Sequence, residues 1–278
     1  MKRAFVFPGQ GSQTPGMGQA LAAAFPAARE LFEEVDEALS QHLSRLMFEG
    51  PEGELMLTEN AQPALLAASL GVIRVLEREA GFDIARQADY VAGHSLGEYS
   101  ALAAAGALPV AEAARLVKRR GQAMQKAVPV GEGAMAALLG LDIEAAHAVA
   151  AAAAQGQVCD LANDNSPGQI VVSGHRAAVE RAVALAAEHG SRRAIMLPVS
   201  APFHCSLMSP AADIMTEALA ETALEAPRVP LVANAAAVAW VTERGCTQQR
   251  PLTRMFLGEN LRPGDPHRQF ALAGPEVG

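Results

Sequence analysis

The residues with the clearest chemical potential are 93–97, whose sequence Gly-His-Ser-Leu-Gly fits the pattern G-x-S-x-G. An apolar run, residues 90–92, precedes them, and a helix-compatible run, residues 98–105, follows them. This order is typical of a nucleophile elbow, in which a strand ends in a sharp turn that presents a serine hydroxyl at a helix N-terminus. The alternative is a strand–helix turn that contains a serine by chance. The motif predicts Ser95 as a nucleophile, but by itself it does not choose between hydrolysis and acyl transfer.

A serine hydroxyl becomes a good nucleophile only when a neighbouring base takes its proton. Of the seven histidines, His94 is adjacent to Ser95, but its side chain is expected to diverge from the hydroxyl. His204 lies in a turn just after a predicted strand, where the chain re-enters the main domain, so it could meet Ser95 across a cleft. The alternative is a surface or capping histidine. His204 is therefore the candidate base.

Three basic residues, Lys118, Arg119 and Arg120, lie near the end of a helical pattern. One interpretation is a solvated basic face that complements the helix dipole. The other is that one arginine binds a substrate carboxylate, because a planar guanidinium can donate two hydrogen bonds to a carboxylate at once.

Composition indicates a helix-rich α/β enzyme, because half of the 278 residues are hydrophobic, alanine is abundant and only 4% are aromatic. The formal net charge of −8 argues against a nucleic-acid partner. The cysteines, Cys159, Cys205 and Cys246, lie far apart without metal-ligand spacing, so no metal site is expected. Few cysteines and no secretory leader favour a cytoplasmic location. No apolar run is long enough to span a membrane, so no membrane partner is expected.

The main domain is expected to begin with a buried strand over residues 4–7, followed by a glycine-rich loop, residues 8–13. Such a loop leaves backbone amides free at the carboxyl end of a strand, where open α/β sheets bind ligands; an ordinary turn is the alternative. The remaining pattern predicts helices over 17–47, 61–80, 98–105, 110–126 and 209–223, and strands over 89–92 and 229–233.

The pattern changes between Ala134 and Leu197. It predicts strands over 134–139, 157–162, 169–173 and 192–197, and helices over 143–154 and 177–189. This βαββαβ order is that of a ferredoxin-like unit. We therefore predict an α/β core with a mostly parallel sheet, formed by residues 1–127 and 198–240, a ferredoxin-like insert over residues 128–197, and a tail over residues 241–278.

Several segments in this order resemble the malonyl-CoA:acyl carrier protein transacylase family. They are Phe-Pro-Gly-Gln-Gly-Ser-Gln at 7–13, Gly-His-Ser-Leu-Gly-Glu at 93–98, Arg-Gly-Gln-Ala-Met-Gln at 120–125, Asn-Asp-Asn-Ser-Pro-Gly-Gln at 163–169 and Pro-Val-Ser-Ala-Pro-Phe-His at 198–204. The resemblance covers residues 3–234 and implies an α/β-hydrolase-like core with a ferredoxin-like insert.

The resemblance implies a role for each matching residue. Ser95 would carry the malonyl group as an ester, and His204 would be its general base. Arg120 would bind the malonyl carboxylate, and the backbone amides of Gln10 and Leu96 would form the oxyanion hole. The expected substrate is malonyl-CoA, with no bound cofactor, and the expected partner is phosphopantetheinylated acyl carrier protein in fatty acid synthesis. A monomer is the expected state.

The tail departs from the family pattern. Family members run on for some thirty residues more and carry a late core strand, glycine-rich turns and a carbonyl that orients the catalytic histidine, and these features are not found in residues 240–278. Two alternatives therefore stand beside malonyl transfer. One is a serine hydrolase or thioesterase that uses the same elbow, and the other is a catalytically impaired copy that only binds the carrier protein.

Basic side chains are also expected to bind the carrier protein, which is expected to be acidic, because a chain of net charge −8 needs a local basic patch to attract it. The candidates are Lys118, Arg119, Lys126, Arg192 and Arg193.

Overall fold

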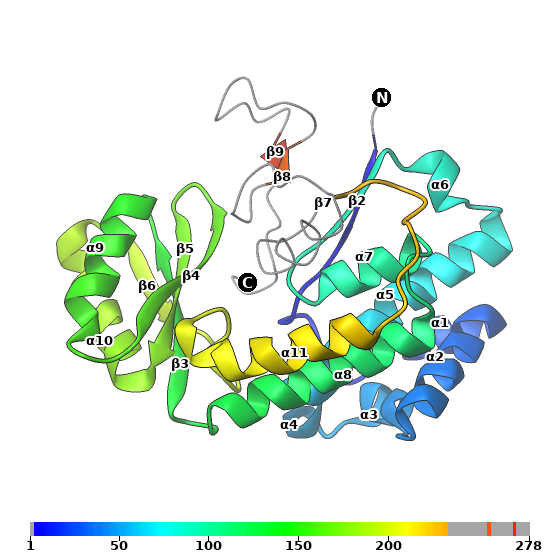
Figure 1. Cartoon of the computed structure of the whole chain (residues 1–278), viewed down its shortest axis with the longest axis horizontal. Helices are drawn as coiled ribbons and strands as arrows, with labels where there is room; N and C mark the ends of the chain where they lie inside the picture. Colours follow the sequence, from blue (N-terminus) through cyan, green and yellow to red (C-terminus); the bar gives the residue numbers. More distant parts are fainter. Residues whose placement is uncertain (1–2, 233–254, 257–268, 271–278) are drawn as a thin grey trace. The chain divides into compact units, whose positions relative to one another are not determined.

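The computed structural model describes residues 3–232, 255–256 and 269–270. Their contacts divide them into two compact units. Residues 3–122 and 214–232 form the first unit, and residues 123–213 with the two short segments near the C-terminus form the second. Two helices continue from one unit into the other: α8 (Val110–Ala127) and α11 (Ser209–Glu221) (Figure 1).

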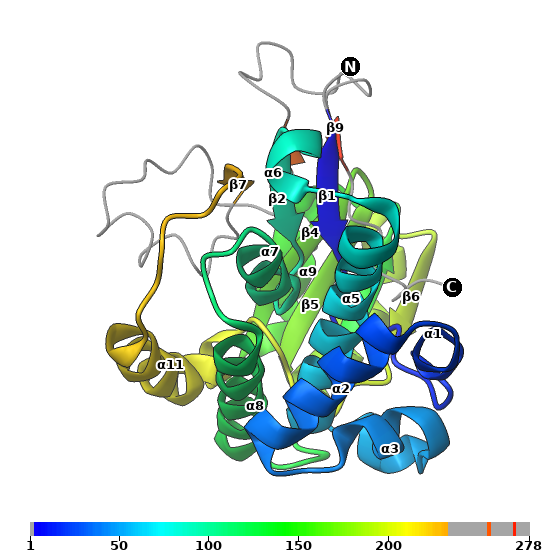
Figure 2. The ribbon, with the colours of Figure 1, turned by 90° about the vertical axis from the view of Figure 1, so that its right-hand side faces the viewer.

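The sheet of the first unit is parallel. Strand β1 (Ala4–Phe7) pairs with β2 (Tyr90–Gly93), and β2 pairs with β7 (Leu231–Val232). Figure 2 shows β1 and β2 side by side. Because β1 and β2 are parallel and in register from Ala4 opposite Tyr90 to Phe7 opposite Gly93, both strands end at the same edge of the sheet. The glycine-rich loop and the elbow therefore begin next to each other.

Helices connect and cover these strands. They are α1 (Gln19–Ala24), α2 (Pro26–Leu39), α3 (Leu43–Glu49), α4 (Glu52–Leu55), α5 (Thr58–Ala80), α6 (Ile84–Gln87) and α7 (Gly97–Ala104). Helix α7 packs against β1 and β2, and α5 packs against both α7 and α2. Leu31, Phe32 and Leu66 are among the fully buried side chains of this core.

The helical pattern predicted over residues 17–47 is divided into three helices. Phe25 is extended, and Pro26 begins α2 at its first position, because proline fits a first turn and disfavours the helical conformation in the residue before it. Ser40 ends α2 in the left-handed conformation, and α3 follows. The other predicted helices lie close to their ranges, except that α5 begins three residues earlier than the predicted 61–80, at Thr58. The short helices α4 and α6 were not predicted.

The second unit contains the predicted βαββαβ order. Its elements are β3 (Gly133–Leu139), α9 (Ile143–Ala154), β4 (Cys159–Ser166), β5 (Gln169–His175), α10 (Arg176–Ala186) and β6 (Arg193–Met196). The strands form an antiparallel sheet in the order β4-β5-β3-β6. Helices α9 and α10 pack against each other and against the strands (Figure 1). Buried apolar side chains from these elements form a common core. This strand order confirms the ferredoxin-like topology.

Contacts place the end of α8 and residues 198–213 with the ferredoxin-like unit. The domain limits predicted from the sequence, at residues 127, 197 and 240, stay predictions. In the tail, β8 (Met255–Phe256) and β9 (Gln269–Phe270) form a two-residue antiparallel pair. The rest of residues 241–278 lies outside the described residues. The prediction that the tail lacks the family's late core strand therefore stays a prediction. Within the part of the chain that the structure describes, no helix is both long and apolar enough to cross a membrane.

Candidate active site

Ser95 lies in the turn between β2 and α7, as the elbow motif predicts. Its φ of 50° is in the left-handed region, which L-residues adopt only at a cost. The amide of Gly97 donates to the carbonyl of His94 at 2.8 Å, and the amide of Glu98 donates to the carbonyl of Ser95 at 3.2 Å. Leu96 directly precedes α7, so its amide is at the N-terminal end of that helix.

The two glycines of the motif are required by close backbone contacts. A Cβ at position 93 would lie 1.9 Å from the carbonyl carbon of Gly97, and one at position 97 would lie 2.3 Å from the carbonyl oxygen of Phe7. Only glycine allows the turn to fold back on itself and to lie against the end of β1. The loop after β1 approaches equally closely, since a Cβ at Gly9 would lie 2.3 Å from His94 Nδ1.

Arg120 contacts the predicted nucleophile. Its Nη2 donates to Ser95 Oγ at 2.9 Å, and its Nη1 donates to Gln62 Oε1 at 2.7 Å. Ser95 and Arg120 are 25 residues apart, and Gln62 is 58 residues from Arg120. Of the three basic residues weighed from the sequence, Arg120 is the one that points at the serine.

The charge beside Ser95 is that of the half-buried Arg120 guanidinium, with the Glu98 carboxyl close enough to act on it. Burial lowers the pKa of Arg120, while Tyr99 and Glu98 oppose this shift. Burial, and then the charge of Arg120, lower the pKa of His94, so this imidazole is neutral at neutral pH. Burial raises the pKa of Tyr99, which keeps its phenol protonated. An anionic acyl group would therefore meet a desolvated positive charge beside the nucleophile.

A chain of side-chain hydrogen bonds continues from Arg120 away from the serine. Gln62 Nε2 donates to Thr58 Oγ1 at 2.8 Å, and Thr58 Oγ1 donates to Gln10 Oε1 at 2.8 Å. Thr58 is 0% exposed and Gln62 is 1% exposed. The sequence analysis identified neither residue. The one signal for them in the sequence is a group of uncharged polar residues, with Asn60 as the third, next to the apolar run of the same helix.

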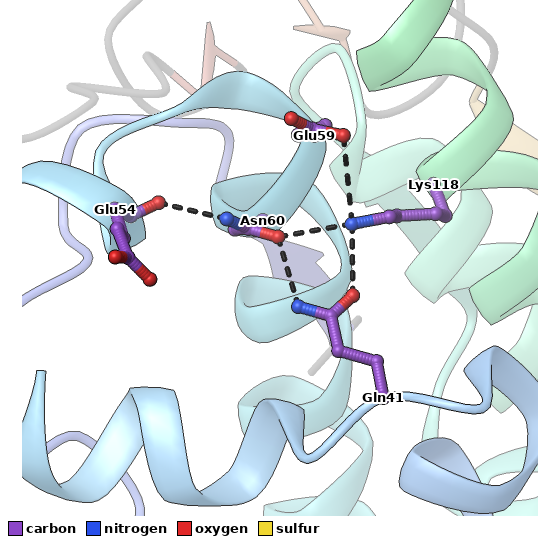
Figure 3. A network of polar contacts seen from close by, with 5 residues as sticks. All are labelled: Gln41, Glu54, Glu59, Asn60 and Lys118. Atoms are coloured by element: carbon purple, nitrogen blue, oxygen red, sulfur yellow. Dashed lines mark hydrogen bonds and ion pairs between the residues drawn. The ribbon is translucent and has the colours of Figure 1, made fainter.

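A second polar network, shown in Figure 3, fixes the helix that carries Arg120. Lys118 Nζ donates to Gln41 Oε1 at 2.8 Å and to Asn60 Oδ1 at 3.0 Å, and lies 3.7 Å from a carboxylate oxygen of Glu59. Asn60 Nδ2 in turn donates to the carbonyl of Glu54 at 2.9 Å. The side chain of Lys118 is 18% exposed, so this predicted carrier contact is instead engaged within the unit, where it ties α8 to α5.

His204 lies in the second unit, in the segment between β6 and α11, and has a φ of 58°. The amide of Ser206 donates to Asp160 Oδ2 at 2.7 Å, which holds the chain just after His204 against β4. The pairing of His204 with Ser95, which lies in the first unit, stays a prediction.

The backbone conformation of His204 is unusual and is shared with Ser95. Four non-glycine residues among those described have positive φ: Ser40, Ser95, Gln155 and His204. Ser40 and Gln155 cap the C-terminal ends of α2 and α9, where this conformation is common. The remaining two are the predicted nucleophile and the predicted base. Strained backbone tends to persist at functional sites.

The two thiols within the described residues, Cys159 and Cys205, do not compete with Ser95 for the nucleophile role. Burial raises the pKa of Cys159 to about 11 and also raises the pKa of Cys205, the neighbour of His204. Both are therefore protonated at neutral pH, and the thiol is a weaker nucleophile than the thiolate. Among the described residues, no three His, Cys, Asp or Glu side chains are grouped so as to hold a metal ion.

Comparisons with known proteins show which family the chain resembles. The acyl transferase domain family matches residues 4–249. The malonyl CoA-acyl carrier protein transacylase of Bacillus subtilis is 48% identical over 256 residues, which cover 92% of this chain and 79% of the relative. The Escherichia coli K12 protein of the same name is 50% identical over 231 residues, which cover 83% and 74%.

Solved structures give the same result. The acyl-carrier-protein S-malonyltransferase of Bartonella henselae has a TM-score of 0.81 and 48% identity, with 88% of this chain and 86% of that chain covered. A malonyl-transacylase in complex with a type II polyketide synthase acyl-carrier protein has a TM-score of 0.80 and 41% identity, with the same coverage. With this extent of match, and with Ser95 and Arg120 in contact, the chain belongs to the acyl transferase family, among its malonyl-CoA:acyl carrier protein transacylases.

Proposed function

We propose that this chain transfers a malonyl group from malonyl-CoA to the pantetheine thiol of acyl carrier protein, through an ester on Ser95, as part of fatty acid synthesis in the cytoplasm. The observation that carries this proposal is the 2.9 Å hydrogen bond from Arg120 to Ser95 Oγ. A guanidinium beside the nucleophile favours an acyl group that ends in a carboxylate, because the buried charge gains a partner when that group binds.

The first half-reaction follows from these roles. His204 takes the Ser95 proton as Ser95 Oγ attacks the thioester carbonyl carbon. The backbone amides of Gln10 and Leu96 donate to the oxyanion that develops on the carbonyl oxygen. The carbon–sulfur bond then breaks, and the His204 imidazolium gives its proton to the leaving CoA thiolate. Malonate is now esterified to Ser95, with its free carboxylate on Arg120.

The second half-reaction is the reverse with a different thiol. His204 takes the proton of the pantetheine thiol, whose sulfur attacks the ester carbonyl carbon. The carbon–oxygen bond to Ser95 breaks, and His204 returns a proton to Ser95 Oγ. The complex of a 41% identical transacylase with an acyl-carrier protein supports this choice of acceptor.

Arg120 separates this proposal from the hydrolase alternative. A general esterase has no use for a buried cation beside its nucleophile, whereas a transferase specific for malonyl requires one. The impaired-copy alternative is decided by whether Ser95 can be acylated at all.

Mass spectrometry of the intact protein after mixing with malonyl-CoA tests the proposal. We expect one malonyl adduct on Ser95 that persists without an acceptor and disappears when holo acyl carrier protein is added. Ser95→Ala should show no adduct. A wild-type protein that forms no adduct would support the impaired copy, and an adduct lost to water as fast as to carrier protein would support a hydrolase.

Steady-state kinetics should show a ping-pong pattern, since one serine serves donor and acceptor in turn. Double-reciprocal plots against malonyl-CoA, at several fixed carrier-protein concentrations, should give parallel lines. Intersecting lines would require a ternary complex and would contradict the Ser95 ester as an obligatory intermediate.

A further inference from the structure

The hydrogen-bonded chain from Arg120 through Gln62 and Thr58 to Gln10 has a single direction. A guanidinium has donors only, so the Gln62 atom that faces Arg120 must be the acceptor, Oε1. The amide nitrogen of Gln62 must then face Thr58, whose oxygen accepts from it. The one hydroxyl proton of Thr58 is thereby left for Gln10 Oε1, to which it donates at 2.8 Å.

The position of the chain connects two parts of the site that lie far apart in the sequence. Arg120 is on α8, Gln62 and Thr58 are on the first turns of α5, and Gln10 is in the loop after β1. Gln62 and Thr58 are almost completely buried, so water cannot replace a lost partner. The same loop has a second attachment nearby, where Gln13 Nε2 lies 3.0 Å from Met56 Sδ.

We propose that the Thr58 hydroxyl is a positioning group for the reaction: it couples the arginine that binds the acyl carboxylate to the loop that supplies the Gln10 oxyanion donor. This inference rests on the proposed roles of Arg120 and Gln10. A hydroxyl suits the position because it is the smallest side-chain group that accepts one hydrogen bond and donates another. Thr58 itself touches no reacting atom.

The coupling has a distinct consequence for the two kinds of acyl group. Loss of the Thr58 hydroxyl removes one of these two attachments of the Gln10 loop, which every acyl group needs for oxyanion stabilisation. It also removes the hydrogen bond that Gln62 Nε2 donates to Thr58, which loosens the support of Arg120, and the carboxylate of a malonyl group binds to that arginine. Thr58 therefore affects acetyl as well as malonyl transfer, whereas Arg120 affects mainly malonyl transfer.

Thr58→Val removes the hydroxyl and keeps the side-chain shape. We expect it to slow the single-turnover acylation of Ser95 about 10-fold with acetyl-CoA and by at least that factor with malonyl-CoA, since a positioned hydrogen bond contributes about 1–1.5 kcal/mol. The rate is taken per active site, counted by titration with a serine-directed sulfonyl fluoride. Thr58→Ser keeps the hydroxyl and should restore most of the rate.

A matched control is Thr222→Val, which removes a hydroxyl that donates to the carbonyl of Ala218, in the last turn of the adjacent α11, and should leave the acylation rate unchanged. A double-mutant cycle tests whether Thr58 acts through Gln10. In a Gln10→Ala background, Thr58→Val should cause little further loss in the rate of acylation by acetyl-CoA. Additive effects would show that Thr58 does not act through Gln10.

Two other results would overturn the inference. Unchanged acylation per active site in Thr58→Val, with only a lower melting temperature, would make the hydroxyl purely structural. A loss confined to malonyl-CoA would show that it serves Arg120 alone. Failure of the proposed function would be seen separately, as wild-type protein that forms no malonyl adduct. In that case the role of Thr58 is still tested by the rate at which the sulfonyl fluoride reacts with Ser95 in Thr58→Val and in Thr58→Ser.

Discussion

Arg120 forms hydrogen bonds to both Ser95 Oγ and Gln62 Oε1. One of its two terminal nitrogens therefore lies beside the nucleophile, and the other is held in place by a buried amide. When a malonyl group binds, its carboxylate offers the guanidinium a stronger acceptor than a neutral hydroxyl does. Selectivity for a carboxylated acyl group and placement of the nucleophile thus depend on the same side chain.

Arg120→Ala should remove malonyl selectivity. Truncating one partner of a desolvated charge pair costs about 2–5 kcal/mol, which corresponds to a loss of roughly 30- to 5,000-fold in kcat/KM for malonyl-CoA. Acetyl-CoA has no carboxylate, so its kcat/KM should fall far less, by no more than the loss of the hydrogen bond from Arg120 to Ser95 Oγ causes. The matched control is Arg119→Ala, because Arg119 is exposed and lies 3.7 Å from a Glu221 carboxylate oxygen. Equal losses for the two donors would assign Arg120 a structural role instead.

A functional residue could be predicted from the sequence where one short motif is enough to recognise it. Ser95 and its two glycines are local, and the structure shows why each is needed. Gln62 and Thr58 could not be found in this way, because their partners are 58 and 48 residues away in the sequence. A buried amide and a buried hydroxyl look like ordinary helix residues until the elements that they connect are brought together.

The crossing of α5 and α8 positions the arginine at the scale of elements. Gly121, next to Arg120, is the point of closest approach: a Cβ there would lie 2.5 Å from Glu59 Cα and 2.7 Å from the carbonyl oxygen of Thr58. The obstacle is helix backbone, which cannot move aside as a flexible side chain can. The two helices can therefore approach this closely only with glycine at this position.

Gly121→Ala should push α8 away from α5 and lengthen the contact between Arg120 and Gln62. We expect a loss of about 1–3 kcal/mol in the free energy of unfolding, as for other overpacked sites, together with a fall in malonyl transfer that exceeds the fall in acetyl transfer. Urea denaturation and the two transfer assays measure these effects. Gly53→Ala is the control, since a Cβ there meets nothing within 4 Å; a similar loss in that variant would refute the crossing argument.

Elements were predicted well where periodicity and chain breakers agree. The ferredoxin-like unit was recovered in order because its strands and helices alternate with clear turns, and α9 lies at its predicted residues. The first 50 residues were harder, since one amphipathic pattern runs through α1, α2 and α3 while the chain changes direction at Phe25 and Ser40. The start of α5 was missed because polar side chains, which the pattern treats as loop, fill its first turn.

At the scale of the whole molecule, the sequence placed nucleophile and base in segments that the structure assigns to two compact units. Topology and family could be predicted because the motifs recur in a fixed order over most of the chain. The approach of His204 to Ser95 depends on how the units meet and stays a prediction. So does the predicted tail, most of which lies outside the described residues.

The pH dependence of global stability should reveal the buried His94. Its pKa is lowered by burial and by Arg120 from the ordinary value of 6.5. As the pH falls below 6.5, the unfolded chain binds this proton before the folded protein does, so the free energy of unfolding should decrease with falling pH. The stability that the lowered pKa of His94 contributes is fully present above pH 6.5 and is lost as the pH falls. For this one group, the slope of the free energy of unfolding against pH cannot exceed about 1.4 kcal/mol per pH unit.

Urea unfolding of the wild type and of His94→Gln at pH values from about 5 to 8 tests this expectation. The substitution should flatten the slope below pH 6.5, whatever its effect on absolute stability. Parallel curves for the two proteins would show that other groups cause the pH dependence.

The left-handed backbone at Ser95 and His204 also bears on how such a protein can be improved. Glycine is the residue that relaxes this conformation, and at most strained positions a change to glycine is a permissible route to a more robust protein. Here that route removes the hydroxyl or the imidazole. A selection for heat resistance alone would tolerate glycine at both positions and return well-folded, inactive proteins, so any engineering of this chain must select for turnover and for durability together.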